Sequence, residues 1–261
     1  MAEIGNATAP VERQGLTAPP ELRSRAGIAL LGSRVVVHGL DLHADCLELG
    51  FVHYLLFCVT GRRFEPAVAR VLEELWVSTG YPDARIWCNR VAGYLGSARV
   101  DPALALAAAL AATNSVSYGF QALRFAYRVQ ASLPEPLAER QSWLTAVLAE
   151  RRVLHGYGRP VHGHDERIDV ALECLARAGL PAGAALGRAF WLERQLGARK
   201  GLEMNIAAVF AAIAIDFGLD EHEFDAFMLL ELAPGYMAVY AEQRRRPPFE
   251  FLRGWHSDVG P

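Results

Sequence analysis

Apolar side chains recur at every third or fourth position along most of this 261-residue sequence. Downstream of Pro66, for example, Val71, Leu72 and Leu75 fall on one side of a helix, and Gly80 then stops the pattern. Residues spaced in this way lie on one face of an α-helix, where they pack against a core. Comparable stripes continue nearly to the C-terminus. The sequence therefore predicts an all-α protein.

Two segments near the N-terminus depart from the helical period. Residues 35–42 are short and β-branched, with Gly39 among them, which indicates one small β-hairpin. The segment up to Arg25 is polar and rich in proline, and it contains no apolar stretch typical of a secretory signal. We therefore expect residues 1–30 to form a flexible N-terminal arm.

The longest apolar runs are residues 103–112 and 206–215. Both are shorter than the roughly 20 residues that span a bilayer, so we predict two helices buried on all sides rather than membrane spans. Breaks in the helical pattern near residues 132–136 and 199–201 suggest two lobes. Residues 31–132 and 200–261 are predicted to form a large helical lobe, and 133–199 a small helical lobe.

The composition excludes some classes of partner. Lys plus Arg is 26 and Asp plus Glu is 29, which gives a net charge of -3. We therefore expect neither a nucleic acid nor a membrane as a partner. Cys46, Cys58, Cys88 and Cys174 are scattered, and no two form a CxxC pair. This spacing argues against zinc and favours reduced thiols in a cytoplasmic protein.

Six motifs in collinear order resemble those of the citrate synthase and citryl-CoA lyase superfamily. The first is HGLDL with the GFVHYLLFCVTGRR that follows, and the second combines NRV, LGSA and DP ahead of Gly119. The others are GYGRPVHGHDER, EMNIAAVFAAIAIDFG, APGYMAVYAEQ and RRPPFEFLRG. The resemblance covers residues 30 to 254. It implies a two-lobe all-α fold, a homodimer, and a cleft for a CoA thioester that is a substrate, with no cofactor.

The sequence departs from this family at three chemical positions. In the family two histidines and an aspartate do the chemistry, and the matching residues here are Tyr118, Arg159 and Ala207. Alanine cannot accept a proton, and a guanidinium stays protonated at neutral pH. General acid–base catalysis needs a group that titrates near the working pH. We therefore do not expect the standard condensation of acetyl-CoA with oxaloacetate.

The resemblance also implies residues that bind substrate. Arg90 matches a helical substrate histidine, Arg167 matches an arginine that binds a carboxylate, and Arg246 matches one contributed across the dimer. Arg159 lies in a glycine-flanked turn and can hold a carboxylate or phosphate through two hydrogen bonds. Asn205 can cap or orient the helix at the pocket. A further carboxylate-binding arginine of the family, two residues before Pro234, is replaced by Leu232.

Each of these residues also has a purely structural interpretation. Asp165, Glu166 and Asp169 are close enough in sequence to neutralise Arg159 and Arg167 locally. Arg246 belongs to a run of three arginines that suits a solvated helix end. Tyr118 can donate its phenol to a developing oxyanion, or it can be a core tyrosine beside a glycine.

Histidines are the remaining candidates for proton transfer, because imidazole titrates near neutral pH. His162 and His164 are the predicted catalytic pair, and His155 is a weaker candidate. The HxH spacing also occurs in metal sites, but no second His/Asp cluster accompanies it. We therefore predict no metal.

Two functions follow from these observations. The first is a diverged enzyme that makes or breaks a carbon–carbon bond in a CoA thioester. In that enzyme Arg159 and Arg167 would hold the acid, Tyr118 the oxyanion, and a histidine would move protons. The second is a non-catalytic paralogue that binds a ligand or a partner subunit. Charged replacements at the pocket positions favour the enzyme, and loss of all three chemical positions favours the paralogue.

Overall fold

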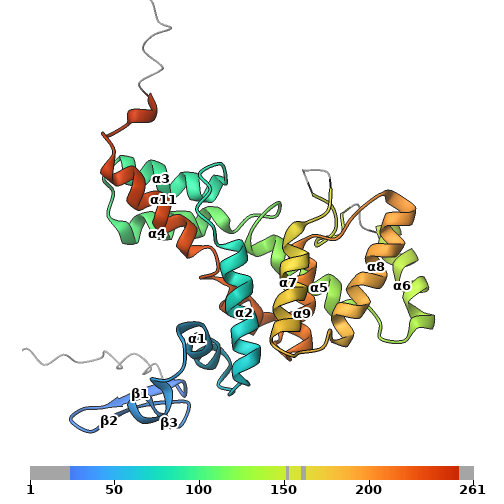
Figure 1. Ribbon diagram of the computed structural model, residues 1–261, viewed down its shortest axis with the longest axis horizontal. Coiled ribbons are helices and arrows are strands. Elements are labelled where there is room, and N and C mark those ends of the chain that lie inside the picture. Colours follow the sequence, from blue (N-terminus) through green and yellow to red (C-terminus); the bar gives the residue numbers. More distant parts are fainter. Residues whose placement is uncertain (1–23, 151–152, 160–162, 253–261) are drawn as a thin grey trace, which may run out of the picture. The chain divides into compact units, whose positions relative to one another are not determined.

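The computed structural model describes residues 24–150, 153–159 and 163–252. A first compact unit ends at Leu47 and contains a three-stranded antiparallel sheet in the order β1-β2-β3. β1 (Gly27–Leu30) pairs with β2 (Arg34–Val37), which pairs with β3 (Leu40–Asp41) (Figure 1). A short π-helix, η1 (Leu42–Cys46), follows the sheet.

The turn between β2 and β3 explains the predicted hairpin. His38 and Gly39 have φ angles of 45° and 86°, and positive φ at both central residues suits the two-residue turns that join antiparallel strands. The hairpin prediction is confirmed. β1 was not predicted; it lies near the end of the range assigned to the N-terminal arm, most of which is outside the described residues.

The second unit, Glu48–Pro261, is helical, which confirms the all-α prediction. Its described residues form α1 (Phe51–Thr60), α2 (Pro66–Thr79), α3 (Trp87–Ser97), α4 (Pro102–Thr113), α5 (Phe120–Ser132), α6 (Leu137–Glu150), α7 (Glu166–Arg177), α8 (Ala184–Lys200), α9 (Ile206–Asp216), α10 (Glu221–Met228), α11 (Ala233–Arg245) and the 3-10 turn η2 (Glu250–Leu252). Local chemistry sets many of the ends. Pro66 occupies the first turn of α2, and Asp220 with Glu223 forms a capping box at α10.

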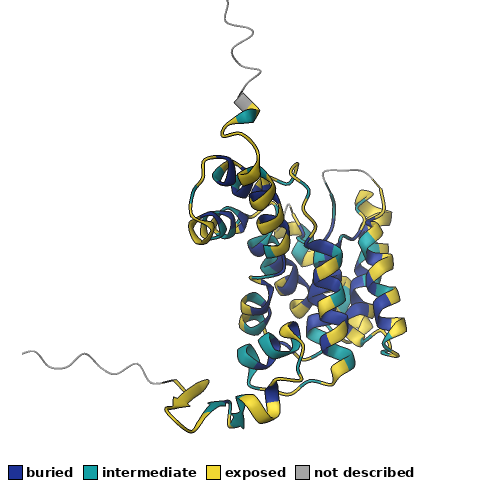
Figure 2. Cartoon of the chain, turned by 60° about the vertical axis from the view of Figure 1, so that its left-hand side comes forward, coloured by how far each residue is buried: buried dark blue, intermediate teal, exposed yellow. Residues whose placement is uncertain are grey.

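Two hydrophobic clusters hold these helices together. The larger one surrounds α9 and gathers α2, α5, α7 and α8, and the smaller one joins α3, α4 and α11. Helix α9 is buried along almost its whole length, as predicted for residues 206–215 (Figure 2). The same prediction for residues 103–112 is wrong. In α4 the described buried residues are Ala105, Ala109 and Thr113. The face that carries Leu104 is exposed, because α3 and α11 cover only one face of the helix.

The division into lobes at residues 133 and 199 stays a prediction. Among the described residues, no helix is both long and apolar enough to span a membrane. The same ranges contain no cluster of three or more His, Cys, Asp and Glu side chains suited to a metal ion.

Candidate functional site

A cavity of about 330 Å³ lies where the two hydrophobic clusters meet. Ile86, Tyr118 and Leu232 line it from the smaller cluster, and Leu123 and Phe210 line it from the larger one. Its other lining residues come from well-separated parts of the chain: Thr79, Tyr81, Ser117, Gly119, Ala122, Gly158, Arg159, Arg167, Asn205, Ile206, Ala207 and Glu231. Of the predicted site residues, Tyr118, Arg159, Arg167 and Asn205 therefore share one cavity.

Several helices begin beside this cavity. Gly119 precedes α5, Asn205 precedes α9 and Leu232 precedes α11, and all three residues line the cavity. The first turn of a helix presents unpaired N–H groups and partial positive charge. Neither α5 nor α11 has a side-chain cap. The converging helix starts therefore favour an anionic ligand.

Gly119 fixes the position of Tyr118. Its φ is 94°, and a Cβ placed there would lie 2.2 Å from the carbonyl oxygen of Thr113. Only glycine fits this approach, which lets Asn114 and Gly119 form a bridge before α5. Burial raises the pKa of the half-buried Tyr118 phenol well above its usual value. The phenol is therefore a hydrogen-bond donor at neutral pH, as an oxyanion requires.

Asn205 joins the Arg159 loop to the start of α9. Its backbone N–H donates to Gly156 O at 2.9 Å, and its side-chain Nδ2 donates to Gly158 O at 2.8 Å. Its Oδ1 accepts from the backbone N–H of Ala207 at 3.0 Å and so caps α9. Through these three contacts Asn205 caps α9 and holds the loop that carries Arg159.

Asp165 pairs with both cavity arginines. Its carboxylate accepts two hydrogen bonds from Arg167, Nε to Oδ1 and Nη2 to Oδ2, each 2.8 Å, and one from the backbone N–H of Ile206 at 2.9 Å. Arg159 Nη1 lies 3.7 Å from Asp165 Oδ1 and 3.3 Å from Glu166 Oε2. Burial opposes ionisation of Asp165, but these donors outweigh it and lower its pKa. The two guanidiniums are therefore compensated locally, as in the structural interpretation of this loop.

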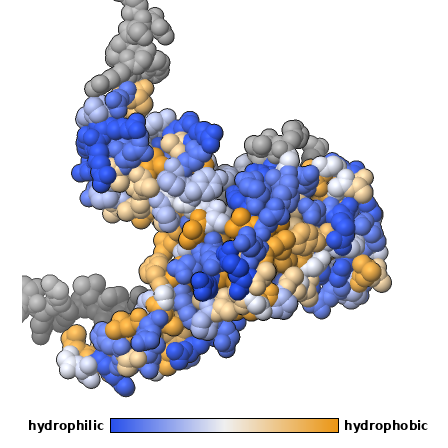
Figure 3. Space-filling view, in the orientation of Figure 1, coloured by the Kyte–Doolittle hydropathy of each residue, from blue (hydrophilic) through white to orange (hydrophobic). Residues whose placement is uncertain are grey.

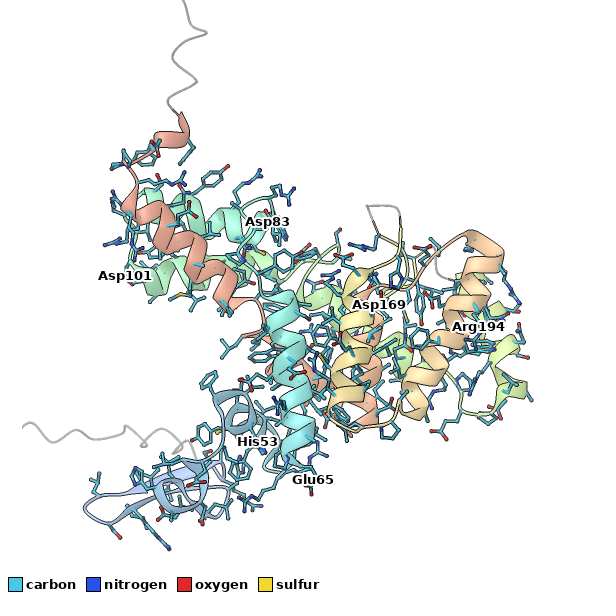
Figure 4. The ribbon with its side chains drawn as sticks, viewed as in Figure 1. His53, Glu65, Asp83, Asp101, Asp169 and Arg194 are labelled. Carbon is cyan, nitrogen blue, oxygen red and sulfur yellow. The ribbon has the colours of Figure 1, made fainter. Side chains whose placement is uncertain are left out.

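The other predicted residues lie away from the cavity lining. Arg90 donates to Ala84 O at 3.2 Å on α3, and Arg246 pairs with Glu242 at the end of α11. His164 Nε2 lies 3.0 Å from Asp169 Oδ2, and both side chains are exposed. Asp169 belongs to α7 (Figure 4). His162 lies outside the described residues.

Glu231 is not among the residues predicted from the sequence. This residue is 4% exposed, lies between α10 and α11, and lines the cavity. Its burial raises its pKa to about 7, although the Thr79 hydroxyl and the Arg167 charge act in the opposite direction. The available signal was a single acidic residue inside the apolar run from Phe227 to Ala233, because a charged residue in such a run is rarely buried without a purpose.

The cavity thus combines positive charge, hydrogen-bond donors and one carboxyl group. Arg159, Arg167 and the helix starts suit an acid or a phosphate, and Tyr118 suits an oxygen on which negative charge develops. Glu231 is the group here whose protonation changes near neutral pH. Together they can hold a carboxylate or thioester and move a proton.

Comparison with known proteins agrees with these features. A family model described as citrate synthase, C-terminal domain, matches residues 22–250. No curated protein matches the sequence of the chain.

Solved structures share the fold at low sequence identity. Citryl-CoA lyase from Hydrogenobacter thermophilus superposes with a TM-score of 0.77 and 20% identity, over 92% of this chain and 94% of that one. ATP citrate lyase from Methanosaeta concilii, in complex with (3S)-citryl-CoA, gives 0.75 and 16%, over 94% of this chain and 42% of that one. Citrate synthase from Thermotoga maritima gives 0.60 and 21%, over 82% and 58%.

Proposed function

Since the chain belongs to the citrate synthase family, we propose that it acts on a CoA thioester, making or breaking a carbon–carbon bond with a non-standard active site. The observation that carries the proposal is the shared cavity of Tyr118, Arg159, Arg167 and Asn205. The citryl-CoA lyase that it resembles matches almost end to end, and a citryl-CoA complex is known for a second structural relative.

The cavity residues take distinct roles in this proposal. Arg167 and Arg159 hold the carboxylate of the acid, and Tyr118 donates its phenol to the thioester oxygen as negative charge develops. Asn205 keeps the Arg159 loop against α9. Because Asp165 already accepts two hydrogen bonds from Arg167, the ligand carboxylate would share that guanidinium with Asp165 rather than meet it alone.

Thermal unfolding in the presence of CoA, acetyl-CoA, citrate and smaller dicarboxylates tests the proposal. A ligand at about 100 times its Kd adds roughly 2.7 kcal/mol to the free energy of unfolding. We expect at least one thioester and one carboxylate to raise the melting temperature. A protein that none of them stabilises would contradict the proposal.

A non-catalytic paralogue is the second candidate. It is favoured by Ala207 in the place of the family's aspartate and by His164, which pairs with Asp169 away from the cavity lining. Such a protein would still bind a carboxylate or a thioester, but it would turn nothing over. Binding without any exchange of the α-hydrogens of a bound thioester would select this candidate.

We also propose that the protein is a homodimer that buries the open face of α4. Leu104 is 65% exposed there, beside a run of alanines, and Tyr94 on α3 and Met237 on α11 are about half exposed. Figure 3 shows apolar patches within the mostly polar surface of these three helices. A second copy of the chain would remove this apolar surface from water.

A further inference from the structure

Glu231 supplies the one carboxyl group to the cavity lining within the described residues. The other polar groups there are guanidiniums, phenols, hydroxyls and an amide, none of which exchanges a proton readily at neutral pH. The backbone of Glu231 is fixed in place. Its N–H donates to Met228 O at 3.2 Å, and its carbonyl oxygen lies so close to Gly80 that a Cβ there would be only 2.6 Å away.

One carboxylate oxygen of Glu231 lacks the hydrogen bonds that hold a structural carboxylate. Its Oε2 is buried and meets no hydrogen-bond donor in the described part of the chain. Asp165, buried nearby, accepts four hydrogen bonds: three from Arg167 and one from Ile206. A buried polar atom without a partner costs free energy, and native proteins rarely keep one without a use. Glu231, which lines the cavity, therefore has a carboxylate oxygen whose hydrogen-bonding capacity the fold leaves unused.

We propose that Glu231 is the proton-transfer residue of this cavity, an inference that rests on the thioester reaction proposed above. In the condensing direction the α-C–H bond of the acyl group breaks and its proton passes to a carboxylate oxygen of Glu231. The electron pair of that bond forms the enolate, whose oxygen accepts a hydrogen bond from Tyr118. In the cleaving direction the protonated Glu231 returns the proton to the α-carbon. Glu231 thereby replaces the carboxylate that the sequence lacks at Ala207.

The charges around Glu231 suit this exchange. Burial raises its pKa to about 7, while the Thr79 hydroxyl on α2 and the Arg167 guanidinium on α7 lower it. Burial raises the pKa values of Tyr118, which precedes α5, and of Tyr236 on α11, and the negative charge of Glu231 raises them further. Both phenols therefore stay protonated when Glu231 ionises. A base is most effective when its pKa lies near the working pH.

Exchange of the α-hydrogens of a thioester for deuterium tests the inference, and it does not require the second substrate to be known. The purified full-length protein is incubated in D2O with acetyl-CoA or propionyl-CoA, and the α-proton signal is followed by NMR. We compare wild type with Glu231→Gln, which keeps shape but cannot take a proton, and with Glu231→Asp. Glu74→Gln is the matched control, because Glu74 is a half-buried carboxylate on α2 that pairs with Arg177 outside this cavity. Melting temperatures with and without each thioester are recorded for every variant.

We expect both thioesters to stabilise wild type and Glu231→Gln alike. Exchange should be about 10² to 10⁴-fold slower in Glu231→Gln, partly retained in Glu231→Asp and unchanged in Glu74→Gln. The wild-type rate should rise with pH through the neutral range. Thioester binding with equal exchange in wild type and Glu231→Gln would overturn the role of Glu231 and leave the proposed function standing. Binding with no exchange in wild type would overturn both, in favour of the non-catalytic paralogue. Failure of every thioester to stabilise the wild type would instead overturn the proposed function, so the two failures are distinct.

Discussion

Arg167 holds Asp165 through two parallel hydrogen bonds of 2.8 Å, and Asp165 in turn accepts the backbone N–H of Ile206 at the start of α9. Asp165 also caps α7. One ion pair therefore joins the first turns of two helices at the cavity wall. Because this pair is neutral overall, the positive charge that faces a ligand there comes from Arg159 and the helix starts.

Replacing Arg167 with alanine should affect both stability and binding. Removal of one partner from a buried ion pair leaves the other charge uncompensated, so we expect a loss of about 3 kcal/mol in the free energy of unfolding. Carboxylate binding should weaken by about 1.5–3 kcal/mol, the scale of a hydrogen bond to a charged group. Chemical denaturation and calorimetric titration with citrate measure the two effects.

A double-mutant cycle separates the two roles of Arg167. In an Asp165→Asn background the ion pair is already lost, so Arg167→Ala should cost much less stability than in wild type. A structural arginine would show the loss of stability with no change in any ligand's affinity. That outcome would remove the main reason for placing a ligand carboxylate beside Arg167.

Standard citrate synthase turnover should be absent. A thiol-release assay with acetyl-CoA and oxaloacetate should stay at background, even if the acetyl group exchanges its hydrogens. The reason is the loss of family residues that act on the keto acid. Arg159 occupies the place of the second family histidine, and Leu232 occupies the place of a carboxylate-binding arginine. Leu232 is apolar and buried, so it cannot bind a keto acid. Robust thiol release would show that these substitutions do not exclude oxaloacetate.

The self-association of the chain can be tested at α4. Sedimentation velocity at micromolar concentration should show a dimer, because the exposed Leu104 face is apolar. Leu104→Lys places a charge in the proposed interface and should give a monomer with an unchanged helical spectrum. Val77→Lys is a suitable control, since Val77 is 76% exposed on α2. A wild-type monomer would rule out the proposed interface.

The helices were predictable because their determinants are local. Pro66 at the start of α2, the Asp220–Glu223 capping box and the apolar length of α9 are all visible in the sequence. The burial of α4 was not, because an alanine-rich helix has nearly the same composition on every side. Which side is covered depends on how α3 and α11 pack against it, and α11 comes from a distant part of the chain.

The candidate site was predictable only in part. The family motifs identified Tyr118, Arg159, Arg167 and Asn205, and these residues do line one cavity. Glu231 was missed because its importance depends on burial and on an unpaired oxygen, which are tertiary properties. The catalytic role of His164 stays a prediction: an imidazole suits proton transfer, and the structure pairs this ring with the exposed Asp169 on α7.

The pH dependence of stability provides a test of Glu231 that needs no ligand. Its pKa is about 7 in the folded protein and near the ordinary value of 4.5 when unfolded. Because the folded pKa is raised, its contribution to stability is fully present below pH 4.5 and is lost as the pH rises through about 7. A difference of about 2.5 pKa units corresponds to about 3 kcal/mol. Glu231→Gln should therefore gain about that much free energy of unfolding relative to wild type between pH 4.5 and pH 8, measured by urea denaturation.

Glu74→Gln is the control and should behave in the opposite sense. An ion pair with Arg177 lowers the pKa of Glu74, so its contribution to stability is lost as the pH falls. Parallel pH profiles for wild type and Glu231→Gln would mean that Glu231 titrates normally in the folded protein, and its burial would then have no bearing on proton transfer.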